Sequence, residues 1–106
     1  MDPARSELGP LPRVRHFEAW NEPNLALFLG PQWVGSEARS PILYRELLNS
    51  FYDGVKAMRP DNLVVAGSLA PYGDEPGHAR MRPLFFLREL FCLEGRRKLT
   101  PQQCPR

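Results

Sequence analysis

An amphipathic helical pattern followed directly by a short apolar run is the feature that most constrains the fold of this chain. Ser40-Pro41 predicts a helix start, because a hydroxyl can cap free amides and proline at the first helical position loses no hydrogen bond. Apolar side chains then recur at helical spacing, at Tyr44, Leu47, Leu48, Phe51, Val55 and Met58. Arg59-Pro60-Asp61 ends the pattern, since the residue before a proline is disfavoured in helical angles.

The apolar run from Asn62 to Gly67 has the length of a strand. Nearly continuous apolar runs are typical of parallel strands that are buried on both faces. A mixed strand pattern also spans Arg13 to Ala19, ahead of the helix. A strand, a helix and another strand in this order predict a βαβ unit over residues 13–68 and an α/β fold.

The segments outside this unit are less regular. Residues 1–12 are rich in Pro, Gly and charge and are expected to form a linker or entry loop, and residues 25–35 an aromatic loop without a regular element. Residues 69–81 form a second loop, 82–94 a helix opened by Arg82-Pro83, and 95–106 a tail. The apolar face of that helix is expected to contain Leu84, Phe85, Leu87, Leu90 and Phe91, widened by Phe86.

The first predicted strand ends in a polar corner, Trp20-Asn21-Glu22-Pro23. Pro23 has no N–H to offer a sheet, so the strand is expected to end there and leave two polar side chains at its carboxyl end. Apolar neighbours such as Trp20 and Phe28 would raise the pKa of Glu22, as in a carboxyl group that donates a proton. The neutral amide of Asn21 suits a sugar hydroxyl. These residue types indicate the proton donor of a glycoside-cleaving site.

The stretch Phe17-Glu18-Ala19-Trp20-Asn21-Glu22-Pro23-Asn24-Leu25 resembles the fourth-strand motif of the retaining (β/α)8-barrel glycoside hydrolases of clan A. It is most similar to the β-xylosidase and α-iduronidase family and to actinobacterial cellulase-family hydrolases, and residues 40–71 resemble the helix and strand that follow. The resemblance implies that Glu22 is the general acid/base and that Asn21 holds the sugar 2-hydroxyl. It also implies a partial TIM barrel, about its fourth strand to its fifth helix.

Length limits what this resemblance implies for activity. A whole barrel needs about 250 residues, whereas the chain has 106. The family's nucleophile follows the seventh strand, and no segment here resembles that strand. We therefore expect a fragment of a glycoside hydrolase barrel that is inactive alone and acts on an oligo- or polysaccharide only with the rest of the barrel. The alternatives are a carbohydrate-binding or pseudoenzyme remnant, and an inert truncated product.

Further sugar contacts are expected from Trp20, Asn24, Trp33 and Tyr72, with His78 as a neighbour in the second loop. Aromatic rings stack on sugars and amides bond their hydroxyls, which gives each residue a role in the resembled site. Without the resemblance, Trp20 is also interpreted as a residue that packs in the core or at its rim, and Tyr72 as an ordinary loop residue.

A second carboxylate, Glu18, precedes Glu22 by four residues. In a regular pleat the two point to the same side about 13 Å apart, which exceeds the separation of either a retaining or an inverting pair. Glu18 is therefore excluded as the nucleophile. We expect it to form a structural ion pair with Arg13 or Arg15.

The two cysteines, Cys92 and Cys104, allow two states. Bridged, they would fasten the tail after the second helix and indicate an oxidising compartment. Unbridged, Cys92 is an ordinary small apolar residue. The resemblance favours the bridge, because such hydrolases are commonly exported. The cysteines and the distant His16 and His78 do not have the spacing of metal ligands, so no metal or cofactor is expected.

Composition excludes several other partners. Charged residues make up 25% of the chain and the net charge is only +2, which argues against binding nucleic acid or a membrane surface by bulk charge. No apolar run is long enough to span a bilayer. The first residues do not resemble a signal peptide, which leaves the destination of a secreted parent undetermined.

Overall fold

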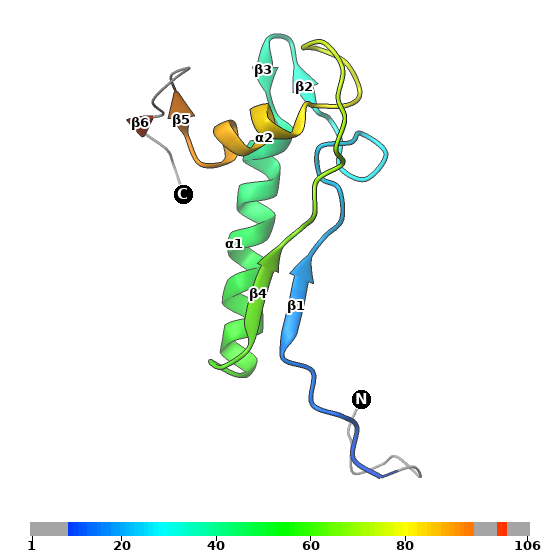
Figure 1. The fold of residues 1–106 in the computed structure, drawn as a ribbon. Helices are drawn as coiled ribbons and strands as arrows, with labels where there is room; N and C mark the ends of the chain where they lie inside the picture. Colours follow the sequence, from blue (N-terminus) through cyan, green and yellow to red (C-terminus); the bar gives the residue numbers. More distant parts are fainter. Residues whose placement is uncertain (1–8, 95–99, 102–106) are drawn as a thin grey trace.

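The computed structural model of the chain describes residues 9–94 and 100–101. Within that part, two helices combine with three small two-stranded sheets (Figure 1). The elements in order are β1 (His16–Ala19), β2 (Trp33–Val34), β3 (Glu37–Ala38), α1 (Ser40–Met58), β4 (Leu63–Ala66), α2 (Pro83–Leu90), β5 (Leu93–Glu94) and β6 (Thr100–Pro101).

The strands β1 and β4 lie side by side and run parallel, with α1 connecting them along one face (Figure 1). Their register pairs His16 with Leu63 and Ala19 with Ala66. The strand–helix–strand order expected from the sequence is therefore present, although β1 begins at His16 and not at Arg13. Because parallel strands end at the same edge, the segments that follow β1 and β4 meet at one end of the molecule.

The sheet formed by β1 and β4 is covered on one face only, which differs from the expectation of a strand buried on both faces. Phe17 and Val64 are half-buried toward α1, whereas Leu63 and Val65 are about half exposed. Among the described residues, no element covers the second face, and each strand pairs only with the other. The continuous apolar run of β4 would suit burial on both faces, but in the described part of the chain only one face is covered.

The start of α1 differs from the predicted serine cap. The residue at the cap position is Arg39, without a side-chain hydrogen bond to the free amides. Ser40 is buried, and its hydroxyl donates to Oε1 of Gln32 at 3.0 Å. The backbone carbonyl of Gln32 in turn accepts from the amides of Arg39 and Ser40. A buried glutamine from the preceding loop therefore fixes this helix start, with Pro41 in the first turn.

Residues 25–35, expected to lack regular structure, contribute one strand of a short hairpin. β2 pairs antiparallel with β3, matching Trp33 with Ala38 and Val34 with Glu37. Gly35 occupies the turn with a φ of +60°, a conformation that glycine adopts without steric cost. The hairpin leads directly into α1 and lies beside α2 (Figure 1).

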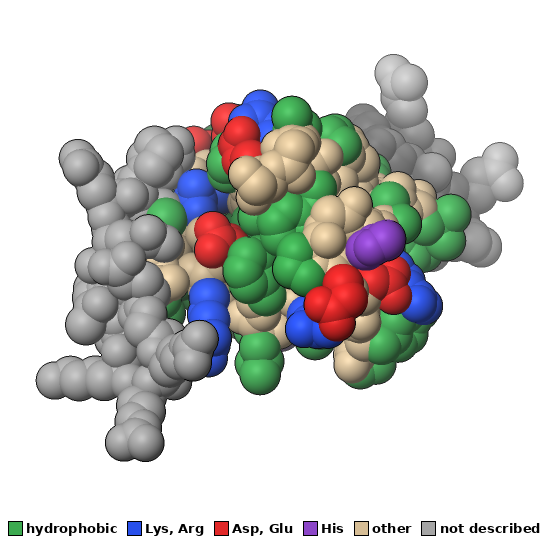
Figure 2. All heavy atoms as spheres, turned by 90° about the horizontal axis from the view of Figure 1, so that it is seen from above, with side chains coloured by type: hydrophobic (Ala, Val, Ile, Leu, Met, Phe, Trp, Pro, Cys, Tyr) green, Lys and Arg blue, Asp and Glu red, His purple; other side chains and the backbone are tan. Residues whose placement is uncertain are grey.

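Apolar side chains also reach the surface at the end of the molecule toward which β1 and β4 point. Viewed from that end, they form the middle of the surface, with acidic and basic side chains beside them (Figure 2). Leu84, Phe85 and Phe91, three residues of the predicted apolar face of the second helix, are all exposed. The prediction is therefore wrong for these three residues, whereas Phe86, Leu87 and Leu90 of the same predicted face do pack in the core.

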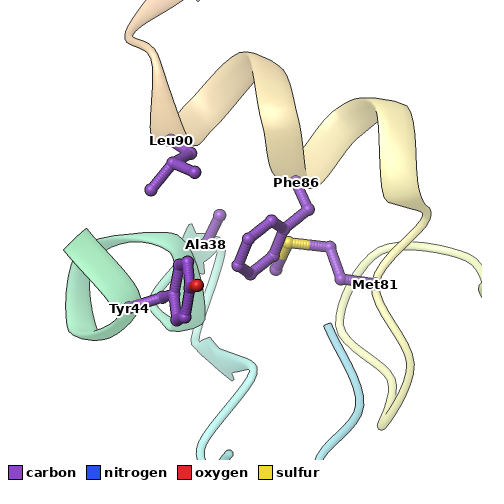
Figure 3. Close-up of a cluster of buried hydrophobic side chains, with 5 residues drawn as sticks. All are labelled: Ala38, Tyr44, Met81, Phe86 and Leu90. Carbon is purple, nitrogen blue, oxygen red and sulfur yellow. The ribbon is translucent and has the colours of Figure 1, made fainter. Parts of the chain in front are cut away.

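The buried face of α2 is centred on Phe86, which is fully buried, and on Leu90 one turn later. Ala38, Tyr44 and Met81 complete this core cluster, and the five side chains converge between α1 and α2 (Figure 3). The helix ends at Leu90 and not at residue 94, and the next residues enter β5, which pairs with β6. Arg45 of α1 donates to the carbonyls of Glu89 and Leu90, which satisfies the end of α2.

Cys92 lies just beyond α2, buried, and its Sγ is 3.2 Å from a guanidinium nitrogen of Arg45. Cys92 is disulfide-bonded and not a free thiol. Its expected partner, Cys104, lies outside the described residues, so the pairing of these two residues stays a prediction. In the described ranges, neither helix is both long and apolar enough to cross a bilayer.

Candidate functional site

The segment Trp20–Glu22 turns sharply after β1. Trp20 has a φ of +70° and Glu22 a φ of +44°, a left-handed conformation that is uncommon for residues with a side chain. The strand already ends at Ala19, so this turn, and not Pro23, terminates it. The turn also breaks the regular pleat on which the 13 Å estimate between Glu18 and Glu22 was based.

Glu22 is anchored through its backbone while its side chain remains unpaired. Its amide donates to the carbonyl of Ser68 at 2.8 Å, and its own carbonyl accepts from the amide of Leu25 at 3.1 Å. The residue is half-buried. Among the described residues, no hydrogen bond or ion pair reaches its carboxyl group. The geometry thus fixes the main chain at Glu22 and leaves the carboxyl available.

Glu18 does not form the expected ion pair. Arg13 and Arg15 both face Asp61, at 3.1 and 3.7 Å, at the opposite end of β1. The carboxylate of Glu18 instead accepts from the amide and the hydroxyl of Ser68, at 2.7 and 2.9 Å. These two hydrogen bonds, the amide first, lower the pKa of Glu18 from its ordinary value. Glu18 therefore holds Ser68, in the segment that follows β4, by two hydrogen bonds.

Tyr44 joins the ends of the two parallel strands from α1. Its buried hydroxyl donates to the carbonyl of Ala19 at 2.7 Å and accepts from the amide of Gly67 at 2.6 Å. Burial raises the pKa of this phenol, and the negative charge of Glu18 acts in the same direction against a lowering by the Gly67 amide. One side chain therefore satisfies backbone groups at the point where both strands end.

Asn24, expected to contact the sugar, is a structural residue. It is fully buried, its amide nitrogen donates to the carbonyls of Ala70 and Met81, and its amide oxygen accepts from the amide of Ala70. All three bonds are about 3 Å long. The expected sugar contact is wrong because no part of this amide is accessible, and the residue joins the loops that follow the two strands.

Trp20 and Asn21 are both exposed at the corner. The indole of Trp20 is 51% exposed, and its Nε1 donates to the carbonyl of Phe28 at 2.8 Å, which holds the ring in one orientation. An exposed aromatic ring that is fixed in this way is a surface on which a sugar face can stack. Trp20, Asn21 and Glu22 are consecutive residues of the turn that follows β1.

Trp33 and Tyr72 lie apart from that group, in a groove of about 610 Å³ that follows β4 and runs to α2. Trp33 stacks on Phe85 with ring centroids 5.6 Å apart, so one face of its indole is covered. The guanidinium of Arg80 lies over the ring of Tyr72 at 5.1 Å while it also pairs with Asp74. The residues lining this groove do not include Glu22, although Glu22 follows the end of β1 and the groove residues from Pro71 onward follow the end of the parallel strand β4.

Three residues that position the corner were missed in the sequence. Gln32 ties the corner to α1, because its side-chain amide donates to the carbonyls of Pro23 and Leu29. Ser68 joins Glu18 to Glu22, and Tyr44 was read only as an apolar helix residue. A polar residue such as Gln32 in an apolar loop was the available signal, whereas nothing in the pattern distinguishes Ser68 from an ordinary turn residue.

Within residues 9–94 and 100–101, no group of three or more His, Cys, Asp or Glu side chains is placed to hold a metal ion. The chain matches no protein-family model, and no curated protein or solved structure is significantly similar to it.

Proposed function

We propose that this chain carries the general acid/base of a retaining glycoside hydrolase, with Glu22 as the proton donor. In this proposal the chain forms the fourth-strand to fifth-helix segment of a TIM barrel and acts on an oligo- or polysaccharide. The nucleophile is a second carboxylate supplied by another segment of that barrel, so the chain alone does not complete the reaction.

One observation carries the proposal: the Glu22 carboxyl follows the end of a parallel strand with its main chain fixed and its side chain unpaired. In TIM-barrel enzymes the catalytic groups follow the carboxyl ends of the strands. An ion pair with Arg or Lys would keep the carboxyl group ionised and so oppose proton donation. No ion pair involves Glu22 in the described part of the chain. In the described part of the chain, one face of the β1–β4 pair is uncovered and its outer edges are unpaired, which supports the presence of neighbouring strands.

The mechanism assigns separate roles to three adjacent residues. Glu22 gives its proton to the departing glycosidic oxygen and then, as a carboxylate, removes a proton from the water that releases the second product. Asn21 bonds a ring hydroxyl through its amide. The fixed indole of Trp20 stacks on the sugar and restricts water around the carboxyl group.

The test uses the complete reading frame that contains this chain and aryl glycosides with leaving groups of different acidity. Glu22→Gln keeps the shape of the side chain and removes the acid, so hydrolysis of poorly activated substrates should slow by about 100- to 10,000-fold. Substrates with acidic leaving groups should lose much less in the first step. Glu46→Gln, an exposed carboxylate on α1, is the matched control and should retain full activity.

Equal losses on all leaving groups would contradict this role for Glu22. The isolated 106-residue chain should show no turnover, and measurable hydrolysis by it would contradict the assignment of the nucleophile to another segment.

A second function is favoured by two separate aromatic surfaces, the groove that Trp33 and Tyr72 line and the exposed indole of Trp20 outside it. Aromatic surfaces of this kind bind glycans without cutting them. In this case the chain is a carbohydrate-binding remnant, and it should bind soluble oligosaccharides in an NMR titration with shifts at Trp20, while the complete reading frame shows no hydrolysis. If the chain shows no binding and the complete reading frame shows no hydrolysis, the chain is an inert truncated product.

A further inference from the structure

The corner that carries Glu22 is not held by the sheet alone. β1 and β4 stop pairing at Ala19 and Ala66, and Glu22 lies three residues beyond that point. Its amide reaches across to the carbonyl of Ser68, two residues beyond the end of β4. The orientation of Glu22 relative to β4 therefore depends on how Ser68 itself is held.

Ser68 is held by one side chain from the facing strand. The Glu18 carboxylate accepts from both donors of Ser68, its amide at 2.7 Å and its hydroxyl at 2.9 Å. A carboxylate accepting two hydrogen bonds is a stronger and more directional partner than a neutral oxygen. The carbonyl of Ser68, which belongs to the same residue, is thereby aimed at the amide of Glu22.

We propose that Glu18 is a positioning residue for Glu22, acting through Ser68. Glu18 fixes Ser68, and Ser68 fixes the left-handed main chain from which the Glu22 side chain projects. The inference rests on the proposed function only for what Glu22 does; the coupling between residues 18 and 22 is a property of the chain itself.

The charge of Glu18 makes this coupling sensitive to pH. The two hydrogen bonds from Ser68 hold the pKa of Glu18 below the ordinary value of a glutamate. From α1, the phenol of Tyr44 feels this charge. On β1, the titratable side chain of His16 lies two residues before Glu18. The neighbouring strand β4 has no titratable side chain, since it consists of Leu63, Val64, Val65 and Ala66. No ion pair among the described residues involves Glu18. Protonation below that pKa removes the charge and weakens the hold on Ser68.

The experiment measures amide hydrogen exchange by NMR in the 106-residue chain. Glu18→Gln should lower the protection of the Glu22 amide by about tenfold. The amide of Gly67, one residue before Ser68, donates to Tyr44 and not to Glu18, so its protection should hardly change. Glu46→Gln is the control variant. Equal loss at Glu22 and Gly67 would show a general loosening and overturn the proposal.

A second measurement stands even where Glu18→Gln does not fold. In the Glu22→Gln chain, residue 22 no longer titrates, so a pH-dependent shift of its amide reports on other groups. That shift should have its midpoint below the ordinary pKa of a glutamate, because the two hydrogen bonds from Ser68 lower the pKa of Glu18. A residue 22 amide that does not respond between pH 2 and 5 would overturn the coupling. If the chain shows the coupling but the complete reading frame does not hydrolyse glycosides, the coupling stands and the proposed function is rejected.

Discussion

Single side chains at the ends of β1 and β4 determine how the candidate site is built. Tyr44, Glu18 and Asn24 each satisfy backbone groups that the sheet leaves unpaired beyond its last pair. Unsatisfied buried backbone groups are costly, and two strands of four residues leave several of them close together. The polar side chains around Glu22 are therefore mainly structural, and the candidate chemistry falls to the exposed Trp20, Asn21 and Glu22.

The hydroxyl of Tyr44 gives the first test at this scale. Tyr44→Phe removes a donor to Ala19 and an acceptor for Gly67 while keeping the ring in the core cluster. We expect a loss of about 1–3 kcal/mol in the free energy of unfolding, the cost of leaving a buried partner unsatisfied. Chemical denaturation measures it. Tyr52→Phe, an exposed tyrosine of the same helix, should be neutral, and equal effects of the two changes would contradict the bridging role.

Sequence alone predicted that a strand ends in a polar corner at Trp20–Glu22, because a strand pattern followed by polar residues and a proline is visible in the residue order, and the structure has a strand that ends at this corner. It misassigned Asn24, Glu18 and Ser40 for one common reason. Each forms hydrogen bonds to residues outside its own element, from eight residues away for Ser40 to 57 for Asn24. Residue type predicts that a polar side chain needs a partner, but only the fold decides which partner it meets.

At the level of elements, the order strand, helix, strand was predictable from periodicity, since an apolar helical face and an apolar run identify the two types directly. The orientation of α2 was not. Its sequence is apolar almost all round, so several faces were equally plausible, and packing against Tyr44 and Met81 selected Phe86. The β2–β3 hairpin was also missed, because strands of two residues are too short to show alternation.

The approach of the two strand ends gives a test at the element scale. A Cβ at Gly67 would lie 2.7 Å from the carbonyl oxygen of Ala19 and 3.0 Å from that of Trp20. Gly67→Ala should therefore push the Trp20–Glu22 turn away from β4 and cost about 1–3 kcal/mol of unfolding free energy. Thermal denaturation, with NMR shifts at Trp20, would detect both effects.

The matched control is Gly54→Ala in α1, where a Cβ meets open space. It should stabilise the chain by about 0.5–1 kcal/mol, the helix preference for alanine. A neutral Gly67→Ala would show that the two strand ends can separate at little cost.

For the whole molecule, the uncovered face of the β1–β4 sheet is the dominant feature. Leu63 and Val65 are about half exposed on strands whose outer edges are unpaired in the described part of the chain. Exposed apolar surface beside open strand edges promotes association. In the proposed barrel, neighbouring strands would occupy these edges.

The isolated chain should therefore self-associate as its concentration rises. Val65→Lys places a charge on the uncovered face, and it should shift this association to higher concentration in sedimentation velocity experiments without lowering the melting temperature. Leu27→Lys is the control, since Leu27 is 83% exposed in a loop away from the sheet. An equal effect of both changes would indicate a general charge effect, and a monomeric wild-type chain would contradict the expectation.

The amide of Asn24 has a consequence for how this chain tolerates changes in length. It fastens the segment after β1 to Ala70 on one side and Met81 on the other. The ten residues between those two points therefore form a loop that is closed at its base whatever its contents. Lengthening that loop costs little, because closure entropy grows only slowly with size. Residues inserted between Glu75 and His78, ahead of the Ala79 carbonyl that accepts from the Ala26 amide, should leave the Glu22 corner in place, whereas a single insertion between Ala19 and Asn24 would displace it.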